Sequence, residues 1–141
     1  MTTITRPLPN LDREETKPFW EACKRHELQI LVCNACKGYV WYPQRVCHRC
    51  NSHDLAWRKM SGKGRIFSYV VLRHPLHPWF ADKLPLAVAL VELADAPEVR
   101  LTSTVLECKP EDVRVGMDVE VVFQKINDDL TMPYFRPVRR T

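Results

Sequence analysis

Four cysteines arranged as two Cys-x2-Cys pairs constrain this chain more than any other feature of its sequence. The pattern is Cys33-x2-Cys36-x10-Cys47-x2-Cys50. Each pair directs two sulfurs toward one point, and two such turns can close a tetrahedron around a metal ion at Zn–S distances of about 2.3 Å. The spacer between the pairs is long enough for one strand and a return. The sequence therefore predicts a small zinc ribbon in which these four cysteines bind one structural Zn²⁺.

A four-cysteine shell leaves no coordination position open, so a metal bound there stabilises a fold and does not activate water. Iron in a rubredoxin-like site is the alternative metal, and two disulfides or four free thiols are the alternatives to a metal. His48 lies inside the second pair, but four sulfurs already complete the shell, so we do not expect it to be a ligand. The other two cysteines, Cys23 and Cys108, are expected to be buried as small apolar side chains.

Length and composition indicate a small globular protein of 141 residues, 45% hydrophobic and 27% charged. No apolar run approaches the roughly 20 residues that span a bilayer. The first residues contain no apolar stretch and no small-residue cleavage pattern, so we expect no secretory signal. These observations predict a cytoplasmic location, where clustered cysteines bind metal in preference to forming disulfides.

The net charge of +4 is distributed unevenly along the chain. Residues 1–65 contain 12 Lys/Arg and 6 Asp/Glu, whereas residues 66–141 contain 9 Lys/Arg and 11 Asp/Glu. Four thiolates with one Zn²⁺ would lower the total to about +2. This weak charge argues against a dedicated nucleic-acid binder, for which a domain pI above about 9 is typical.

Hydrophobic periodicity predicts one short helix followed by strands. The helix is expected from Pro18 to His26, with Phe19, Trp20 and Cys23 on one apolar stripe. Strands are predicted at 28–32, 39–42, 55–60, 65–72, 86–93, 99–105, 117–123 and 134–136, with a helical turn at 110–113. The last five strands, with the turn before the fourth, fit a five-stranded OB-fold barrel.

The predicted fold class is therefore mainly β: an N-terminal helix, a small zinc ribbon and an OB-fold. The predicted segments are an N-terminal arm and helix over residues 1–27, a rubredoxin-like zinc ribbon over 28–63, and the OB-fold over 64–141.

No catalytic arrangement is recognisable in the sequence. His74 and His77 stand three residues apart, but the prolines beside them exclude a regular helix, so a stiff loop is expected there and not a metal pair. Some aromatic side chains are expected to lie outside the hydrophobic cores of the ribbon and the barrel. We expect these to anchor a protein interface and not to stack on nucleic-acid bases, because the acidic second half of the chain would repel phosphates. The candidates are Trp41, Tyr42, Trp57, Trp79, Phe80, Tyr134 and Phe135.

Taken in order, these segments resemble the acyl-CoA-associated OB-fold proteins that carry an N-terminal rubredoxin-like zinc ribbon. The matching pieces are Lys17–Glu21, Leu28–Val32, Cys33–Cys50, Ser61–Tyr69, Val88–Leu93, Pro110–Met117 and Phe135–Pro137. They span nearly all of residues 17–138, and their combination is specific although each piece alone is weak. Some members have a degenerate ribbon, whereas the four cysteines are intact here.

The resemblance implies a non-catalytic accessory subunit of an acyl-CoA-processing complex. Such a subunit forms a hetero-oligomer with a thiolase-like enzyme, or alternatively with an acyl-CoA hydratase or aldolase, and bridges or stabilises the catalytic subunits. No membrane association is expected. A CoA thioester is a candidate ligand, and the basic residues of the ribbon half are candidates for contacting CoA phosphates or an acidic partner surface. These residues are Arg45, Arg49, Arg58, Lys59 and Lys63.

The alternative function is binding of single-stranded nucleic acid, because OB-folds and zinc ribbons both occur in such proteins. A salt-dependent shift with an oligonucleotide would distinguish this alternative. A third interpretation is an enzyme in its own right, which would have to turn over acyl-CoA without a partner.

Overall fold

The computed structural model describes residues 5–138, which form one helix, eight strands and two short 3-10 turns. Residues 1–4 of the predicted arm and 139–141 of the predicted OB-fold segment lie outside the described residues. In chain order the elements are α1 (Lys17–Lys24), β1 (Leu28–Cys33), β2 (Tyr39–Val40), β3 (Leu55–Met60), β4 (Lys63–Leu72), η1 (Pro78–Phe80), β5 (Leu86–Leu93), β6 (Arg100–Thr104), η2 (Pro110–Asp112), β7 (Asp118–Lys125) and β8 (Thr131–Pro137).

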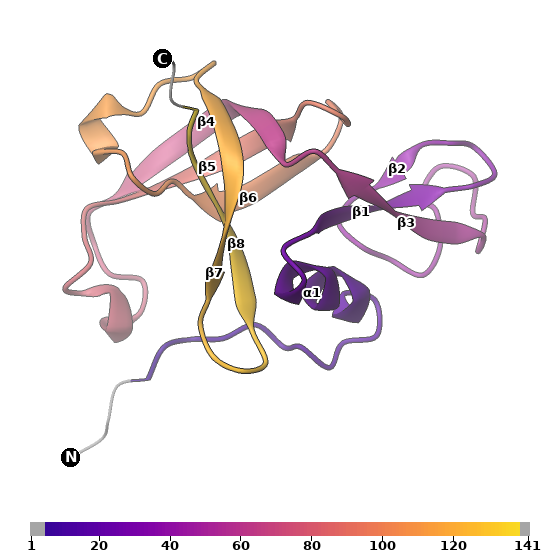
Figure 1. Ribbon diagram of the computed structural model, residues 1–141, viewed down its shortest axis with the longest axis horizontal. Helices are drawn as coiled ribbons and strands as arrows, with labels where there is room; N and C mark the ends of the chain where they lie inside the picture. Colours follow the sequence, from indigo (N-terminus) through magenta and orange to yellow (C-terminus); the bar gives the residue numbers. More distant parts are fainter. Residues whose placement is uncertain (1–4, 139–141) are drawn as a thin grey trace.

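A three-stranded antiparallel sheet in the order β2-β1-β3 forms the ribbon beside the larger β-barrel (Figure 1). Strands β1 and β3 pair from Leu28–Met60 to Cys33–Leu55, so the first cysteine pair begins where this ladder ends. The predicted strand at 39–42 is shorter in the structure and ends at Val40. The chain leaves the sheet at Trp41, whose ring lies 5.4 Å from the ring of Phe19 in α1.

The second sheet has the order β6-β5-β4-β7-β8, and all of its strand pairs are antiparallel. The two edge strands approach each other near Val105 and Phe135, which form a parallel bridge. The Leu106 amide also donates to the Phe135 carbonyl at 2.7 Å. The sheet is therefore a near-closed five-stranded barrel, with η2 before its fourth strand, and the predicted mainly β fold class is confirmed.

The strand β5 is almost wholly apolar, but it is not equally buried on its two faces. Buried and half-buried residues alternate along it. Ala87, Ala89, Val91 and Leu93 face the barrel interior, whereas the residues between them are only partly covered. Because β5 pairs with β4 on one side and with β6 on the other, this apolar strand does not present an unpaired edge.

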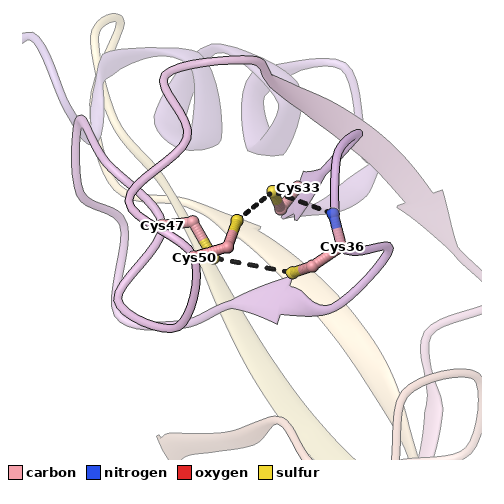
Figure 2. A group of neighbouring side chains, drawn as sticks. All are labelled: Cys33, Cys36, Cys47 and Cys50. Carbon is pink, nitrogen blue, oxygen red and sulfur yellow. Dashed lines mark hydrogen bonds between the residues drawn. The ribbon is translucent and has the colours of Figure 1, made fainter.

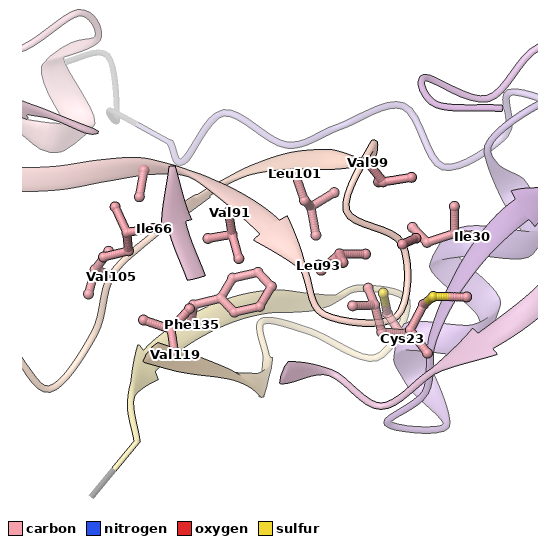
Figure 3. Close-up of a cluster of buried hydrophobic side chains, with 14 of the residues drawn as sticks. Cys23, Ile30, Ile66, Val91, Leu93, Val99, Leu101, Val105, Val119 and Phe135 are labelled. Carbon is pink, nitrogen blue, oxygen red and sulfur yellow. The ribbon is translucent and has the colours of Figure 1, made fainter. Parts of the chain in front are cut away.

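One continuous core joins the helix, the base of the ribbon and the barrel (Figure 3). The helix contributes Phe19 and Cys23, and the barrel contributes Phe135, which is fully buried. The other members of this core are Leu28, Ile30, Met60, Ile66, Ala87, Ala89, Val91, Leu93, Ala96, Val99, Leu101, Val105, Val113 and Val119. An eight-residue helix is too short to be stable alone, so this packing holds α1 in place.

The ribbon has only a small core of its own, formed by Leu31, Cys33, Val40 and Cys47. Two of these four residues belong to the cysteine pairs, so the ribbon depends on the cysteine site for its internal packing.

Among the described residues, no helix has the length and apolar character needed to cross a membrane.

Candidate metal centre and adjoining cleft

The two cysteine pairs converge at the end of the ribbon, where the sulfurs of Cys33, Cys36, Cys47 and Cys50 face one another (Figure 2). All four sulfurs lie within 4.8 Å of one another. The Cys33 and Cys50 sulfurs are 3.5 Å apart, and those of Cys36 and Cys47 are 3.7 Å apart. Sulfurs at the corners of a tetrahedron with Zn–S bonds of 2.3 Å are about 3.8 Å apart. A disulfide would need about 2.05 Å. The arrangement therefore fits a tetrahedral metal ion.

The backbone builds the two cysteine turns in the same way. The amides of Lys37 and Asn51 donate to the carbonyls of Cys33 and Cys47, at 2.8 and 2.9 Å. Lys37 and Asn51 have left-handed φ angles of 66° and 62°. This conformation is uncommon outside glycine, and it occurs at the same place in each turn. It directs both cysteines of a pair toward the shared centre.

Hydrogen bonds already favour the thiolate form at part of this site. The Gly38 amide, helped by the Arg49 side chain, lowers the pKa of Cys36 to about 6. The amides of Cys50 and Arg49 lower the pKa of Cys47. At Cys50 the Ser52 amide favours the thiolate, but the hydrogen bond between the sulfurs of Cys50 and Cys33, together with burial, raises the pKa to about 11. Four thiolates this close repel one another, and a bound divalent cation would remove that repulsion.

Within residues 5–138, no other group of three or more potential ligands gathers in this way. His48 lies outside the group, and its Nε2 atom is 3.0 Å from Nη1 of Arg49. His77 takes part in the stiff loop predicted around it, because its Nδ1 accepts a hydrogen bond from the Trp79 amide at 3.1 Å. Cys23 is buried in the main core as expected, whereas Cys108 is only half-buried.

The five basic candidates do not form one patch. Arg45 forms 2.9 Å ion pairs with Glu14 and Glu15. Lys59 pairs with Glu27 at 3.8 Å, and Lys63 lies in a separate surface depression whose other charged residues are Arg65, Glu92 and Asp118.

Arg49 and Arg58 are brought together around Tyr39. Arg49 donates to the Tyr39 carbonyl at 2.6 Å, and Arg58 donates to the Tyr39 hydroxyl at 3.3 Å.

An apolar cleft of about 330 Å³ lies where α1, the loop after β2 and the edge strands β6 and β8 meet. Trp41, Tyr42 and Pro43 form one wall, and Tyr42 is 56% exposed there. The remaining lining residues are Thr16, Phe19, Trp20, Val88, Leu101, Thr102, Ser103, Thr104, Met132, Pro133 and Tyr134. The cleft opens at the seam of the barrel, which Ser103 crosses by donating from Oγ to the Pro133 carbonyl at 2.7 Å.

The aromatic candidates separate into core and surface residues. Phe135 is fully buried in the core. Tyr134 is also buried but lines the cleft together with Trp41 and Tyr42. Trp79 and Phe80 pack edge to face on each other, and Trp57 packs at the edge of both cores. No motif in the sequence indicated the opposite wall of the cleft. Residues 101–104 and 132–134 are far apart in the chain and show only the alternation of ordinary strands.

Comparison with known proteins matches both parts of the chain. Residues 20–56 match the family described as "ChsH2, rubredoxin-like zinc ribbon domain", and residues 57–124 match "ChsH2, C-terminal OB-fold domain". The chain is 36% identical to a DUF35 domain-containing scaffold protein of Methanocaldococcus jannaschii, over 84% of this chain and 88% of that protein.

A second relative is a probable enoyl-CoA hydratase alpha subunit of Thermomonospora curvata, with 37% identity over 94% of this chain. The present chain spans only 40% of the length of that subunit. Among solved structures, a chain of the Ltp2-ChsH2(DUF35) aldolase superposes with a TM-score of 0.80 and 35% identity, covering 94% of this chain and 98% of the other.

Proposed function

This chain belongs to the ChsH2/DUF35 family, which joins a rubredoxin-like zinc ribbon to an OB-fold, and we propose that it is a non-catalytic accessory subunit of an acyl-CoA-processing complex. The observation that carries the proposal is the similarity to a DUF35 scaffold protein over 88% of that protein's length. A scaffold stabilises or bridges other chains, and an accessory subunit would do this for catalytic subunits. We also propose the cytoplasm as the location, because the cysteine site requires reduced sulfurs.

Cys33, Cys36, Cys47 and Cys50 bind one structural Zn²⁺ in this proposal. The sulfur separations of 3.5 and 3.7 Å and the match of residues 20–56 to a zinc ribbon support the assignment. Four protein ligands complete a tetrahedral shell, so the ion holds the two cysteine turns together.

The catalytic partner in this proposal is a thiolase-like enzyme, with an acyl-CoA hydratase or an aldolase as the alternatives. The relatives' names support the two alternatives and not the thiolase, since one relative is a probable enoyl-CoA hydratase alpha subunit and another is a chain of an aldolase. The apolar cleft supports a protein contact, because an exposed aromatic side chain at the rim of a water-accessible apolar pocket is typical of interface anchors. Tyr42 is the residue proposed for this role.

The proposal also includes a supporting role for this chain in binding the CoA part of the substrate. Arg45 and Lys59 already have carboxylate partners, and the carboxylates of Glu92 and Asp118 in the depression of Lys63 disfavour a phosphate there. Arg49 is engaged by the Tyr39 carbonyl and lies near the Cys36 sulfur. Arg58 is therefore the strongest of the five basic candidates, because it is exposed and its hydrogen bond goes to the neutral hydroxyl of Tyr39.

The test is affinity purification of the tagged chain from its native cell, with zinc content and co-purifying proteins measured in the same preparation. One zinc per chain together with a stoichiometric enzyme of CoA metabolism is the expected result, and the identity of that enzyme chooses among thiolase, hydratase and aldolase. Recovery without any such enzyme would contradict the accessory role. Recovery with bound nucleic acid, released by salt, would favour the alternative function.

A further inference from the structure

Arg49 belongs to the second cysteine turn, but its side chain reaches across to the first. Its Nη2 atom donates to the Tyr39 carbonyl at 2.6 Å, two residues beyond Lys37. Its guanidinium also lies near the sulfur of Cys36, the exposed cysteine of the first turn, and its positive charge favours the thiolate there. The side chain therefore links the two halves of the cysteine site by a hydrogen bond to the Tyr39 carbonyl that does not involve a metal.

The glycine at position 38 is explained by this contact. A Cβ atom added to Gly38 would lie 2.5 Å from Cζ and 2.7 Å from Nε of Arg49, and closer still to Nη2. These three guanidinium atoms are the nearest atoms to that Cβ position. The left-handed glycines of the described residues are Gly62 and Gly116, so the backbone at Gly38 would accept an ordinary residue. The space that a side chain would occupy at position 38 is filled by Arg49.

The negative charge of the cysteine site makes the position of the Arg49 guanidinium important for metal binding. Four thiolates with Zn²⁺ carry a net charge of −2, and two of the sulfurs, those of Cys36 and Cys50, belong to exposed residues. Arg45 directs its charge toward Glu14 and Glu15, so it does not offset the sulfurs. Groups that hydrogen-bond to metal ligands commonly change metal affinity by about 10–100-fold.

We propose that Arg49, seated against Gly38, is a positioning residue that clamps the two cysteine turns together and slows the loss of metal through the exposed Cys36. The proposal rests on the zinc site proposed above. Arg49 acts on the metal through Cys36 and the Tyr39 carbonyl, and it is not itself a ligand.

The experiment measures zinc release from the purified full-length chain to excess 4-(2-pyridylazo)resorcinol, which absorbs visible light when it captures the metal. Arg49→Ala is expected to release zinc about tenfold faster than the unmodified chain. Gly38→Ala is expected to act in the same direction, because the new methyl group displaces the guanidinium while Arg49 is retained. Arg45→Ala is the matched control: it removes an exposed arginine from the same ribbon and should leave the rate unchanged.

A spectroscopic measurement separates positioning from a general loss of stability. In the Co²⁺-substituted protein, the sulfur-to-cobalt charge-transfer band reports hydrogen bonds to sulfur. It is expected to shift in Arg49→Ala and Gly38→Ala and to remain unchanged in Arg45→Ala. Arg49→Lys keeps the positive charge but lacks the planar guanidinium group, so its zinc-release rate is expected to lie between those of the unmodified chain and Arg49→Ala.

Unchanged release rates and unchanged cobalt spectra in Arg49→Ala and Gly38→Ala would overturn the clamp while leaving the zinc site intact. An unmodified chain that binds no zinc would instead overturn the zinc site and the clamp together, so the two failures are distinguishable.

Discussion

At the scale of single residues, six cysteines occupy three different environments. Four of them converge within 4.8 Å at the ribbon tip, where backbone amides favour thiolates at Cys36 and Cys47. Cys23 is fully buried in the main core, where desolvation raises its pKa to about 12. Cys108 is half-buried and lies outside the group of potential metal ligands. The same side chain is therefore proposed as a metal ligand in one place and as a small apolar residue in another.

Cys33→Ser should abolish zinc binding, because oxygen replaces one of the four sulfurs and the fully buried Cys33 also packs in the ribbon core. A structural zinc site contributes about 10–16 kcal/mol of binding free energy that is coupled to folding. Zinc content should fall from one per chain to none by elemental analysis. Cys108→Ser is the matched control and should keep its zinc. Full zinc content in Cys33→Ser would rule out that ligand.

Cys23 should make the protein less stable as the pH rises above about 9. The folded state holds the Cys23 proton up to about pH 12, whereas the unfolded chain releases it near its ordinary pKa of 9.0. The unfolded state therefore binds fewer protons in this range, and the unfolding free energy should fall by at most about 1.4 kcal/mol per pH unit. Urea unfolding at pH 8 and pH 10 would measure the loss. Cys23→Ala should lose less stability over the same interval; an equal loss would show that other groups cause it.

At the scale of elements, the helix and the two sheets are held by a shared core and by little else. Helix α1 buries Phe19, Ala22 and Cys23. Thr16 occupies its N-cap position, but no side-chain hydrogen bond caps the helix there. The edge strands β6 and β8 meet through few hydrogen bonds, so the side chains beneath them close the barrel. Phe135 lies at this closure, with its ring inside the core (Figure 3).

Phe135→Ala should therefore lower the unfolding free energy by about 3–5 kcal/mol, the usual cost of a large cavity in a packed core. Chemical denaturation monitored by far-UV circular dichroism would measure the change. Val115→Ala provides the comparison, since Val115 is 67% exposed and its truncation should stay within about 0.5 kcal/mol. A cost below about 1 kcal/mol for Phe135→Ala would contradict the central role assigned to this ring.

At the scale of the whole molecule, the ribbon and barrel are joined more closely than the predicted segments suggest. Leu28, Ile30 and Met60 lie in the segment predicted as ribbon, but they pack in the same core as the barrel strands. The division at 1–27, 28–63 and 64–141 remains a proposal about sequence segments. The base of the ribbon belongs physically to the main core, and only its tip depends on the cysteine site.

Removal of zinc by a chelator should consequently unfold the tip of the ribbon and leave the barrel folded. The small core at the tip contains two of the proposed ligands, whereas the main core contains none of them. Amide hydrogen exchange should rise strongly in residues 33–57 and change little in Leu86–Leu93. Loss of protection in both regions together would show that the protein unfolds as one unit.

The proposed contact with a catalytic partner can be tested on the intact molecule. Tyr42→Ser removes an exposed aromatic ring from the rim of the apolar cleft and should weaken partner co-purification about tenfold or more, as loss of an interface anchor does. Leu76→Ser changes a more exposed apolar residue, 83% accessible and outside the cleft, and should leave partner recovery unchanged. Equal recovery with both variants would place the interface elsewhere.

The sequence by itself determined the order and type of the secondary-structure elements and which four cysteines converge. Strands at 55–60 and 86–93 were predicted with the bounds found in the structure, because β-branched, apolar and turn residues act locally. The cysteine spacing likewise predicted which four sulfurs would converge, since each pair is a local turn. The strand predicted at 39–42 ends early because Trp41 packs on the helix, which is a tertiary contact. The strand predicted at 99–105 is one residue too long at each end, whereas the strand predicted at 134–136 is shorter than the observed Thr131–Pro137.

Only the tertiary structure decided how these pieces meet. The seam between β6 and β8, the cleft across it and the reach of Arg49 over Gly38 all join residues that are distant in the chain or in different turns. Charge alone also could not show which basic residues serve the cysteine site. Arg45 and Arg49 carry the same charge, but Arg45 lies beside carboxylates and Arg49 lies beside a cysteine sulfur. Local patterns fix the conformation of a segment, whereas contacts between segments depend on packing, which periodicity and spacing do not encode.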